Sequence, residues 1–317
     1  MIFMPKLSFF EPCLWLAVDI GFDKGAVTGS DAAELWRAVI KDGLLTTRPE
    51  QALALLEPMR ASGQVSNMDC CGVLIECRDQ EHGARLFLKF LGRAYDFAPA
   101  CLLALAHGLS VGIGRQKVVG SVLGVHAWGS EGWQEIAVPL ISAELERWRA
   151  DPALLAGFKG KALESCLVTH PQHVLQVLTR SRWLWRQQGK PVARVPELAD
   201  VLTLVAHRVE RFDWVWGRAE RALWADSLDA PLRQARQIKR IAHNWHPVRR
   251  KVGGQYPSHG YTGRLVFEGC VSVDLMYWLY AGSFLHVGQQ TAIGLGGYDL
   301  ATFSGSGQLA QQTKGVA

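Results

Sequence analysis

The chain has 317 residues, of which 49% are hydrophobic and 20% are charged, a balance typical of a globular protein with room for two domains. Its formal net charge is only +5, so the total charge by itself argues weakly for a polyanionic partner. The seven cysteines include no pair with zinc-site spacing, and no uninterrupted apolar run reaches the roughly 20 residues that a membrane helix needs. We therefore expect a cytoplasmic protein with reduced thiols, no metal, no cofactor and no membrane partner.

Strand-like and helix-like segments alternate through the first half of the chain. Ser30 suits a helix N-cap, and Leu35, Trp36, Val39 and Ile40 then recur on one helix face. Short apolar runs bounded by polar or glycine residues predict strands. The expected elements are a strand within 7–18, a helix from 30, strands at 71–77 and 85–91, a helix at 99–106 and a strand at 117–125.

The second half repeats this order with a longer middle. Leu198, Val201, Leu202 and Val205 form the apolar face of a predicted helix. A long tryptophan-containing stretch after it is expected to be a helical insert. The expected elements are a strand at 166–169, a helix at 196–212, the insert at 213–245, a strand at 262–268, a helix at 271–280 and a strand at 298–303.

Each half thus has the order strand, helix, strand, strand, helix, strand, which a ferredoxin-like fold requires. Both halves also end with an apolar helix, a glycine-containing step and a last strand, a weak internal repeat. We predict an α+β protein with two tandem ferredoxin-like (RRM-like) domains. The expected divisions are 1–150 and 151–303 with a boundary within 144–161, a helical insert at about 213–245 and a flexible tail at 304–317.

Basic residues are concentrated between Asp229 and Glu268, a stretch without any acidic residue. Arg233, Arg236 and Arg240 recur at i, i+3 and i+7, the spacing of one stripe on a helix. A run of charges is usually a solvated face, but an expected loop at 244–251 adds aromatic groups, and cations with rings suit RNA. The predicted RNA-binding residues here are Arg233, Arg236, Lys239, Arg240, His243, Arg249, Arg250 and Lys251.

A glycine-rich segment over 286–298 precedes the last expected strand. Glycine in an otherwise apolar segment usually marks positive φ or the close approach of another group. A dinucleotide site would place its glycines between a first strand and a helix, whereas a strand follows here. We therefore predict a loop that admits an RNA backbone through Gly288, Gly294 and Gly296.

These segments carry a family resemblance. The run Gly260–Gly269, the apolar helix ending at Ala281–Gly282 and the run Leu285–Tyr298 together resemble the C-terminal signature of the CRISPR-associated precursor-RNA processing endoribonucleases of the RAMP superfamily. Gln289 stands where that family typically has lysine. Residues 85–125 are similar to the family's first domain.

The resemblance implies metal-independent cleavage of CRISPR repeat RNA at or beside a hairpin, which yields mature crRNA. The ribose 2′-hydroxyl attacks the adjacent phosphate and leaves a 2′,3′-cyclic phosphate and a 5′-hydroxyl. A base takes the 2′-proton, cations stabilise the phosphorane and an acid protonates the leaving oxygen. The resemblance also implies that the protein stays on the repeat hairpin, with other subunits of a CRISPR ribonucleoprotein complex as further partners.

The catalytic residues are less clearly marked than the family. Many members are similar in using a histidine on the first helix, but this chain has no histidine before residue 82. The candidates near that helix are Lys24, Arg37 and Lys41, and the high pKa of arginine suits Arg37 to orienting RNA and stabilising charge. His286 is the other candidate because an imidazole titrates near neutral pH, although a histidine that braces the loop is the favoured interpretation.

Two other function classes remain open. The missing histidine favours a non-catalytic subunit that stays on the crRNA hairpin of an effector complex, and a divergent family member such as those of type IV systems. A general RNA-binding scaffold outside CRISPR systems is disfavoured by the specific pattern over 260–298.

Overall fold

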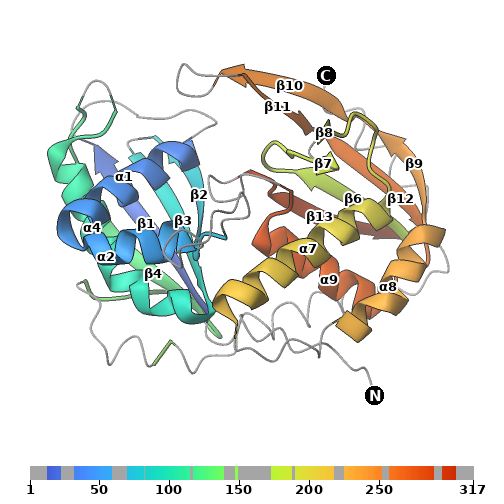
Figure 1. Ribbon diagram of the computed structural model, residues 1–317, viewed down its shortest axis with the longest axis horizontal. Helices are drawn as coiled ribbons and strands as arrows, with labels where there is room; N and C mark the ends of the chain where they lie inside the picture. Colours follow the sequence, from blue (N-terminus) through green and yellow to red (C-terminus); the bar gives the residue numbers. More distant parts are fainter. Residues whose placement is uncertain are drawn as a thin grey trace.

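Figure 1 shows the computed structural model of the chain, in which two lobes lie side by side. The structure describes residues 13–22, 32–58, 70–81, 83–114, 117–138, 147–148, 173–187, 190–217, 225–251, 257–288 and 295–304. Lys24, Ser30, Gly294 and the strand expected at 166–169 lie outside these residues. So does the tail after 304, and so does the boundary region apart from 147–148.

The N-terminal lobe holds an antiparallel five-stranded sheet in the order β2-β3-β1-β4-β5. Its first four strands and two main helices follow the ferredoxin-like order, with α2 and β5 added. The elements are β1 (Cys13–Phe22), α1 (Ala32–Thr47), α2 (Pro49–Leu56), β2 (Val73–Gln80), β3 (Gly83–Leu91), η2 (Gly92–Phe97), α4 (Ala98–Val111), β4 (Gly120–Gly129) and β5 (Gly132–Glu135).

The core of this lobe follows from alternation along β1. Leu14, Leu16, Val18 and Ile20 are all buried, and they share one face because successive strand side chains point to opposite sides. Helices α1 and α4 cover that face, and Trp36 of α1 is fully buried there. The opposite face of the sheet carries no helix of its own lobe (Figure 1), as far as the described residues show.

One segment of this lobe, Gly92–Val111, is long and apolar enough to cross a membrane by length and composition alone. Its second part is α4, which packs between α1 and β4. Cys101, Leu105 and Leu109 are buried there. The apolar character of this segment is therefore explained by its place in the protein core.

The C-terminal lobe repeats the arrangement with a four-stranded sheet in the order β13-β6-β12-β9. The hairpin of β10 and β11 is inserted between β9 and β12, and α8 follows α7 as an added helix. The predicted α+β architecture of tandem ferredoxin-like domains with a helical insertion is confirmed. The elements are β6 (His173–Thr179), β7 (Arg186–Gln187), β8 (Lys190–Pro191), α7 (Leu198–Trp216), α8 (Ala225–Gln237), β9 (Lys239–His243), β10 (His246–Lys251), β11 (Pro257–Thr262), β12 (Arg264–Gly269), α9 (Val273–Leu285) and β13 (Tyr298–Ser304).

The extent of the helical insert over 213–245 was wrong. Residues 213–216 are the last turn of α7, and 239–243 form strand β9. The expected loop at 244–251 is also wrong, because β10 occupies 246–251 and pairs with β11. Pairing of β9 with β12 and of β10 with β11 supplies hydrogen bonds that local periodicity does not reveal.

The two lobes meet where α7 ends. The indole Nε1 of Trp216 donates to the Cys70 carbonyl at 2.7 Å, and Arg93 Nη2 donates to the Val215 carbonyl at 3.0 Å. Gly92 has φ +56°, and a Cβ on it would overlap the Trp216 carbonyl oxygen. Glycine is therefore required at this position for the lobes to approach each other.

Candidate nucleic-acid interface

The two described ends of the glycine-rich segment lie at the end of α9 and at the start of β13. The amide of Val287 donates to the Gly296 carbonyl at 3.0 Å, and the Gly296 amide donates to the Arg182 carbonyl at 2.9 Å. Gly288 and Gly296 have φ values of +85° and +84°. A Cβ on Gly288 would lie 2.7 Å from the Leu184 carbonyl oxygen, so both ends of the loop are pinned in conformations that favour glycine.

A cluster of packed aromatic rings contacts the C-terminal end of this segment. Trp183 is fully buried and lies edge-on to Tyr298 at 5.4 Å and to Trp245 at 5.5 Å. Trp245 stacks in turn on Tyr261 of β11 at 5.9 Å. The indole Nε1 of Trp183 donates to the Gly297 carbonyl at 3.3 Å, so the loop and the β10–β11 hairpin are held by one shared cluster.

The hairpin carries the predicted cations Arg249, Arg250 and Lys251 on β10. It extends along the top of Figure 1 from the C-terminal lobe toward the N-terminal lobe. Residues 246–251 pair with 257–262 in antiparallel register. A two-stranded arm with consecutive basic residues can follow a phosphate backbone.

The predicted arginine stripe is only partly present. Arg233 and Arg236 are exposed on α8, and Lys239 and His243 are exposed on β9. Arg240 is not on the helix: its Nη1 donates to the carbonyls of Val195 and Pro196 and pairs with Glu197 at 2.8 Å. Placing Arg240 on one helical stripe was therefore wrong, since α8 ends at Gln237 and the guanidinium braces the start of α7.

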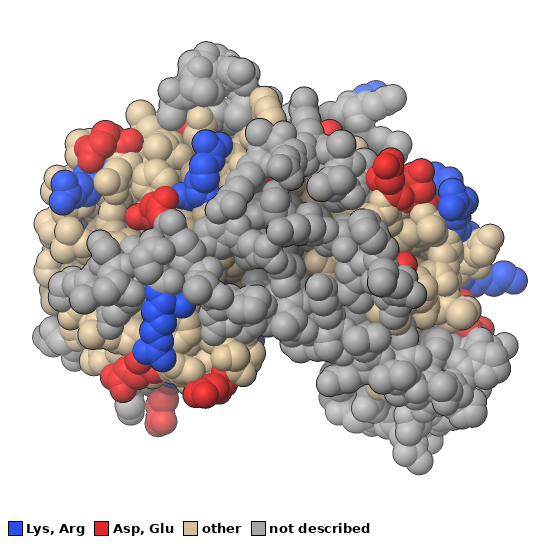
Figure 2. Space-filling model, turned by 90° about the horizontal axis from the view of Figure 1, so that it is seen from below, with Lys and Arg blue, Asp and Glu red and all other residues tan. Residues whose placement is uncertain are grey.

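Charge is mixed among the described residues on the face that Figure 2 shows. In Figure 2 the described Lys and Arg side chains lie among Asp and Glu side chains on this face of the molecule, without a broad field of one sign. The cations of α8, β9 and β10 come from the acid-free stretch between Asp229 and Glu268. That stretch is therefore the better candidate for contacts with phosphate.

The two described candidates on α1 both reach the end of α2. Arg37 Nη2 donates to the Leu56 carbonyl at 3.3 Å, and Lys41 Nζ pairs with Glu57 at 2.7 Å. They lie one helical turn apart and are half-buried. His286 belongs to the other lobe, so the structure does not bring the three residues together.

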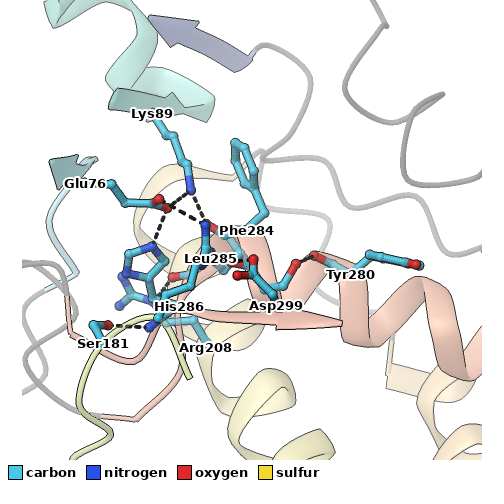
Figure 3. Close-up of polar contacts among 12 residues, drawn as sticks. Glu76, Lys89, Ser181, Arg208, Tyr280, Phe284, Leu285, His286 and Asp299 are labelled. Atoms are coloured by element: carbon cyan, nitrogen blue, oxygen red, sulfur yellow. Dashed lines mark hydrogen bonds and ion pairs between the residues drawn. The ribbon is translucent and has the colours of Figure 1, made fainter. Parts of the chain in front are cut away.

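His286 lies in a buried polar cluster between the lobes (Figure 3), where its Nε2 lies 2.7 Å from Glu76 Oε1. Only 1% of its surface is exposed, and burial lowers its pKa to about 4 despite the neighbouring carboxylate. Burial alone would raise the pKa of Glu76, but Lys89, His286 and Arg180 hold it well below its ordinary value. At neutral pH the ring is therefore uncharged, and Nε2–H donates to an ionised carboxylate.

A second group of polar residues lies on the helix-free face of the N-terminal sheet, and sequence reasoning missed it. Asp19 on β1 accepts two bonds from Arg85, Nε to Oδ1 at 2.6 Å and Nη2 to Oδ2 at 2.7 Å. His126 Nε2 lies 3.2 Å from Asp19 Oδ2, and 27% of its side chain is exposed. The Arg85 guanidinium lowers the pKa of Asp19, so an ionised carboxylate orients an accessible imidazole.

Aromatic residues adjoin this group on the same face. Trp15, Trp128 and Trp133 lie with ring centroids 5.0 to 5.5 Å apart, and Phe87 joins Trp133 at 5.8 Å. Trp133 keeps 36% of its surface exposed, and the Arg78 guanidinium lies over Phe87 at 4.9 Å. The signal in the sequence was alternation: positions 15 and 19 of β1 fall on one face, opposite the core leucines.

Two ferredoxin-like domains in tandem, with a glycine-rich segment before the last strand, make up the fold of this chain. Residues 158–298 match the family model described as CRISPR-associated endoribonuclease Cas6. The matched stretch contains α9, the glycine-rich segment and the inserted hairpin. The resemblance inferred from the sequence is confirmed: over this stretch the chain is similar to the Cas6 endoribonuclease family.

Solved structures agree on the fold over nearly the whole chain. Cas6 from Thermus thermophilus aligns with a TM-score of 0.53 at 12% identity, over 91% of this chain and 98% of that one. A Cas6 product complex aligns with a TM-score of 0.52 at 14% identity, over 91% and 100% of the two chains. A chain of a partial Cas6-RT-Cas1–Cas2 complex aligns with a TM-score of 0.59 at 12% identity, over 92% of this chain and 46% of that one. No curated protein matches the sequence.

Proposed function

We propose that this protein binds CRISPR repeat RNA and cleaves it to generate mature crRNA, remaining on the repeat hairpin afterwards. One observation supports the proposal most directly. A single aromatic cluster contacts both the glycine-rich segment and the positively charged β10–β11 hairpin, and both lie within the stretch that matches the Cas6 family model. The loop offers backbone to a phosphate chain, and the hairpin with α8 and β9 offers cations. Other subunits of a CRISPR complex are further expected partners.

The proposed contacts divide between the two lobes. Residues Arg233, Arg236, Lys239, His243 and the basic residues of β10 hold the phosphates of the paired stem. The rings of Trp128 and Trp133 are suited to stacking on unpaired nucleotides, as in other ferredoxin-like RNA-binding sheets. Arg240 contributes through the fold of α7, because its guanidinium is already engaged.

The reaction needs a base and a cation beside the 2′-hydroxyl and the scissile phosphate. His126 is suited to act as the base, because Asp19 holds its Nε2 and leaves Nδ1 for substrate. Arg85 is engaged by the same carboxylate through Nε and Nη2, so its proposed role is to keep Asp19 ionised and in place. Lys24, Arg37 and Lys41 remain proposed contributors near α1, whereas the burial of His286 favours its role as a brace.

A second function is favoured by a specific observation. Arg37 and Lys41 are held by contacts within their own lobe, and His286 is buried. A protein with this arrangement suits retention of crRNA without cleavage, as a non-catalytic subunit of an effector complex. The two functions share the same RNA-binding surface and differ only in chemistry.

Incubation of the pure protein with its repeat RNA in EDTA separates these functions. The nuclease proposal expects a single cut that leaves a 2′,3′-cyclic phosphate and that is abolished by a 2′-deoxy nucleotide at the cut site. Binding without a cut would refute the nuclease and support the subunit. Failure to bind repeat RNA at all would overturn both.

A further inference from the structure

Three cationic side chains, from β3, from α7 and from the segment after β6, donate to carbonyls at the C-terminal end of α9. Arg180 Nη2 donates to the Ser283 carbonyl at 2.7 Å, and Arg208 Nε donates to the Leu285 carbonyl at 3.2 Å. Between them, Lys89 Nζ donates to the Phe284 carbonyl at 3.2 Å, although Lys89 belongs to β3 of the other lobe. The last carbonyls of a helix have no partner within it, and cations at this end also complement the helix dipole.

One carboxylate from the N-terminal lobe connects this cationic cap to the start of the glycine-rich loop. Glu76 of β2 pairs with Lys89 through Oε1 and with Arg180 Nη1 through Oε2 at 3.0 Å. The same Oε1 accepts from His286, the first residue after α9, at 2.7 Å. Figure 3 shows Glu76 and Lys89 pointing together at the end of this helix.

Burial makes these contacts interdependent. Lys89 and His286 are each 1% exposed and Arg208 is 4% exposed. A buried charge is stable only while its partners remain, so loss of the Glu76 carboxylate leaves the buried Lys89 ammonium without its counter-ion.

The backbone at His286 adds a second, independent observation. Its φ of +60° with ψ of 150° lies in a region that residues with a side chain rarely adopt. Such a conformation persists only where the surroundings enforce it. Among the described residues, the hydrogen bond from the ring to Glu76 holds His286 from outside the C-terminal lobe.

The same residues control both ends of the glycine-rich loop. Val287 directly follows His286, and its amide bonds to Gly296. At the far end, the Arg180 amide donates to the Gly297 carbonyl at 2.9 Å, and the Gly297 amide donates to Ser181 Oγ at 2.9 Å. The Glu76 carboxylate contacts both His286 and Arg180, so it is linked to both described ends of the glycine-rich segment.

We propose that Glu76 is a positioning residue through which the N-terminal lobe sets the conformation of the two described ends of the glycine-rich segment, 286–288 and 295–298, so that these ends are shaped for RNA only when the two lobes are docked. The effect of Glu76 on the ends of the segment follows from contacts within the protein and does not depend on RNA. The consequence for RNA rests on the proposed function.

Amide hydrogen exchange of the RNA-free protein tests the effect of Glu76 on the ends of the segment. In Glu76→Gln we expect exchange at Val287, Gly296 and Gly297 to be at least ten-fold faster. Asp79→Asn is the matched control, because Asp79 is exposed on the same strand, and it should leave these rates unchanged. Unchanged protection in Glu76→Gln would overturn the proposal.

The double variant Glu76→Gln with Lys89→Met distinguishes positioning from bulk stability. Removing the buried cation together with the carboxylate charge should recover much of the thermal midpoint lost in Glu76→Gln, while one neutral amide oxygen still replaces the two charged oxygens that held His286 and Arg180. We therefore expect stability to recover and loop protection to remain low. Recovery of loop protection as well would contradict a positioning role.

Repeat RNA binding supplies the second measurement. We expect the affinity of Glu76→Gln to fall about ten-fold and that of Asp79→Asn to remain unchanged. Faster loop exchange with unchanged affinity would keep the positioning role and refute the proposed contact of this loop with RNA. If the unmodified protein binds no repeat RNA, the proposed function fails, and the exchange measurement still decides the role of Glu76.

Discussion

At the scale of single residues, two histidines have very different surroundings: His286 in the C-terminal lobe and His126 in the N-terminal lobe. His286 is enclosed between Glu76, Lys89 and Arg180, and its Nδ1 is buried without a hydrogen-bond partner among the described residues. His126 is partly exposed and lies against an ionised carboxylate. Burial favours the neutral ring of His286, whereas accessibility makes His126 available to a substrate.

The depressed pKa of His286 predicts acid sensitivity. In the unfolded chain this ring takes a proton below its ordinary pKa of about 6.5, whereas in the folded state it stays neutral down to about 4. Stability should therefore fall as the pH drops from about 6.5 to 4, by up to about 2 kcal/mol at pH 5. Thermal midpoints at pH 7.5 and pH 5 should show a drop that His286→Gln reduces, and an equal drop in the variant would refute this origin.

The geometry of His126 predicts a catalytic effect. Loss of a general base typically costs about 10²- to 10⁴-fold in rate, so His126→Gln should slow cleavage of repeat RNA strongly and change its affinity little. His207→Gln is the control, because His207 is exposed on α7 with 63% of its side chain accessible. Equal cleavage rates for the two variants would remove His126 from the mechanism.

At the scale of elements, the arginines of the basic stretch are exposed on α8 but engaged within the protein on β9. Arg233 and Arg236 project from α8 and are exposed, whereas the guanidinium of Arg240 in β9 is bound to carbonyls before α7. Exposed cations can exchange counterions for phosphate, and an engaged cation cannot do so without breaking its contacts.

Separate outcomes are expected for these arginines. Arg233→Glu and Arg236→Glu should each weaken repeat RNA binding and lower the salt dependence of log K by about 0.7 to 0.9 per lost phosphate contact. Arg240→Ala should instead lower the thermal midpoint. Arg48→Glu makes the same charge change as the first two variants at an exposed site of the N-terminal lobe, and a matching loss of RNA affinity there would contradict a specific role for α8.

At the scale of the whole molecule, the docking of the lobes depends on backbone contact as well as on the buried charges. Gly92 lies against the carbonyl of Trp216, the last residue of α7. The Trp216 indole reaches back to the Cys70 carbonyl. Tight contact at this point keeps Glu76 and Lys89 within reach of α9.

Gly92→Ala should therefore disturb the docking. Alanine at positive φ costs about 1 to 2 kcal/mol at any position, and at residue 92 the added methyl group also overlaps the other lobe. Gly114→Ala is the control, with φ +68° and no atom within 4 Å of the added carbon. Thermal unfolding and small-angle scattering should show a larger loss of stability and a more extended shape only for Gly92→Ala, and equal effects would refute the steric explanation.

The amino-acid sequence by itself determined the tandem ferredoxin-like architecture and the family resemblance. Apolar periodicity places strands and helices in order, and glycines mark the positive-φ positions on either side of the loop, because both are local properties of the chain. The predicted limits of the helical insert and the predicted arginine stripe were wrong. Residues expected in a helix or loop form β9 and β10 instead, because they pair with β12 and β11.

Only the tertiary structure decided which charges are engaged and which are available. The sequence separates Glu76 from His286 by 210 positions and Asp19 from His126 by 107, and no local pattern encodes such pairs. Sheet register and lobe docking bring them together, and the resulting burial makes His286 a neutral brace while leaving His126 accessible. Chemistry at these sites depends on desolvation and on partners distant in sequence, which are properties of the packed molecule.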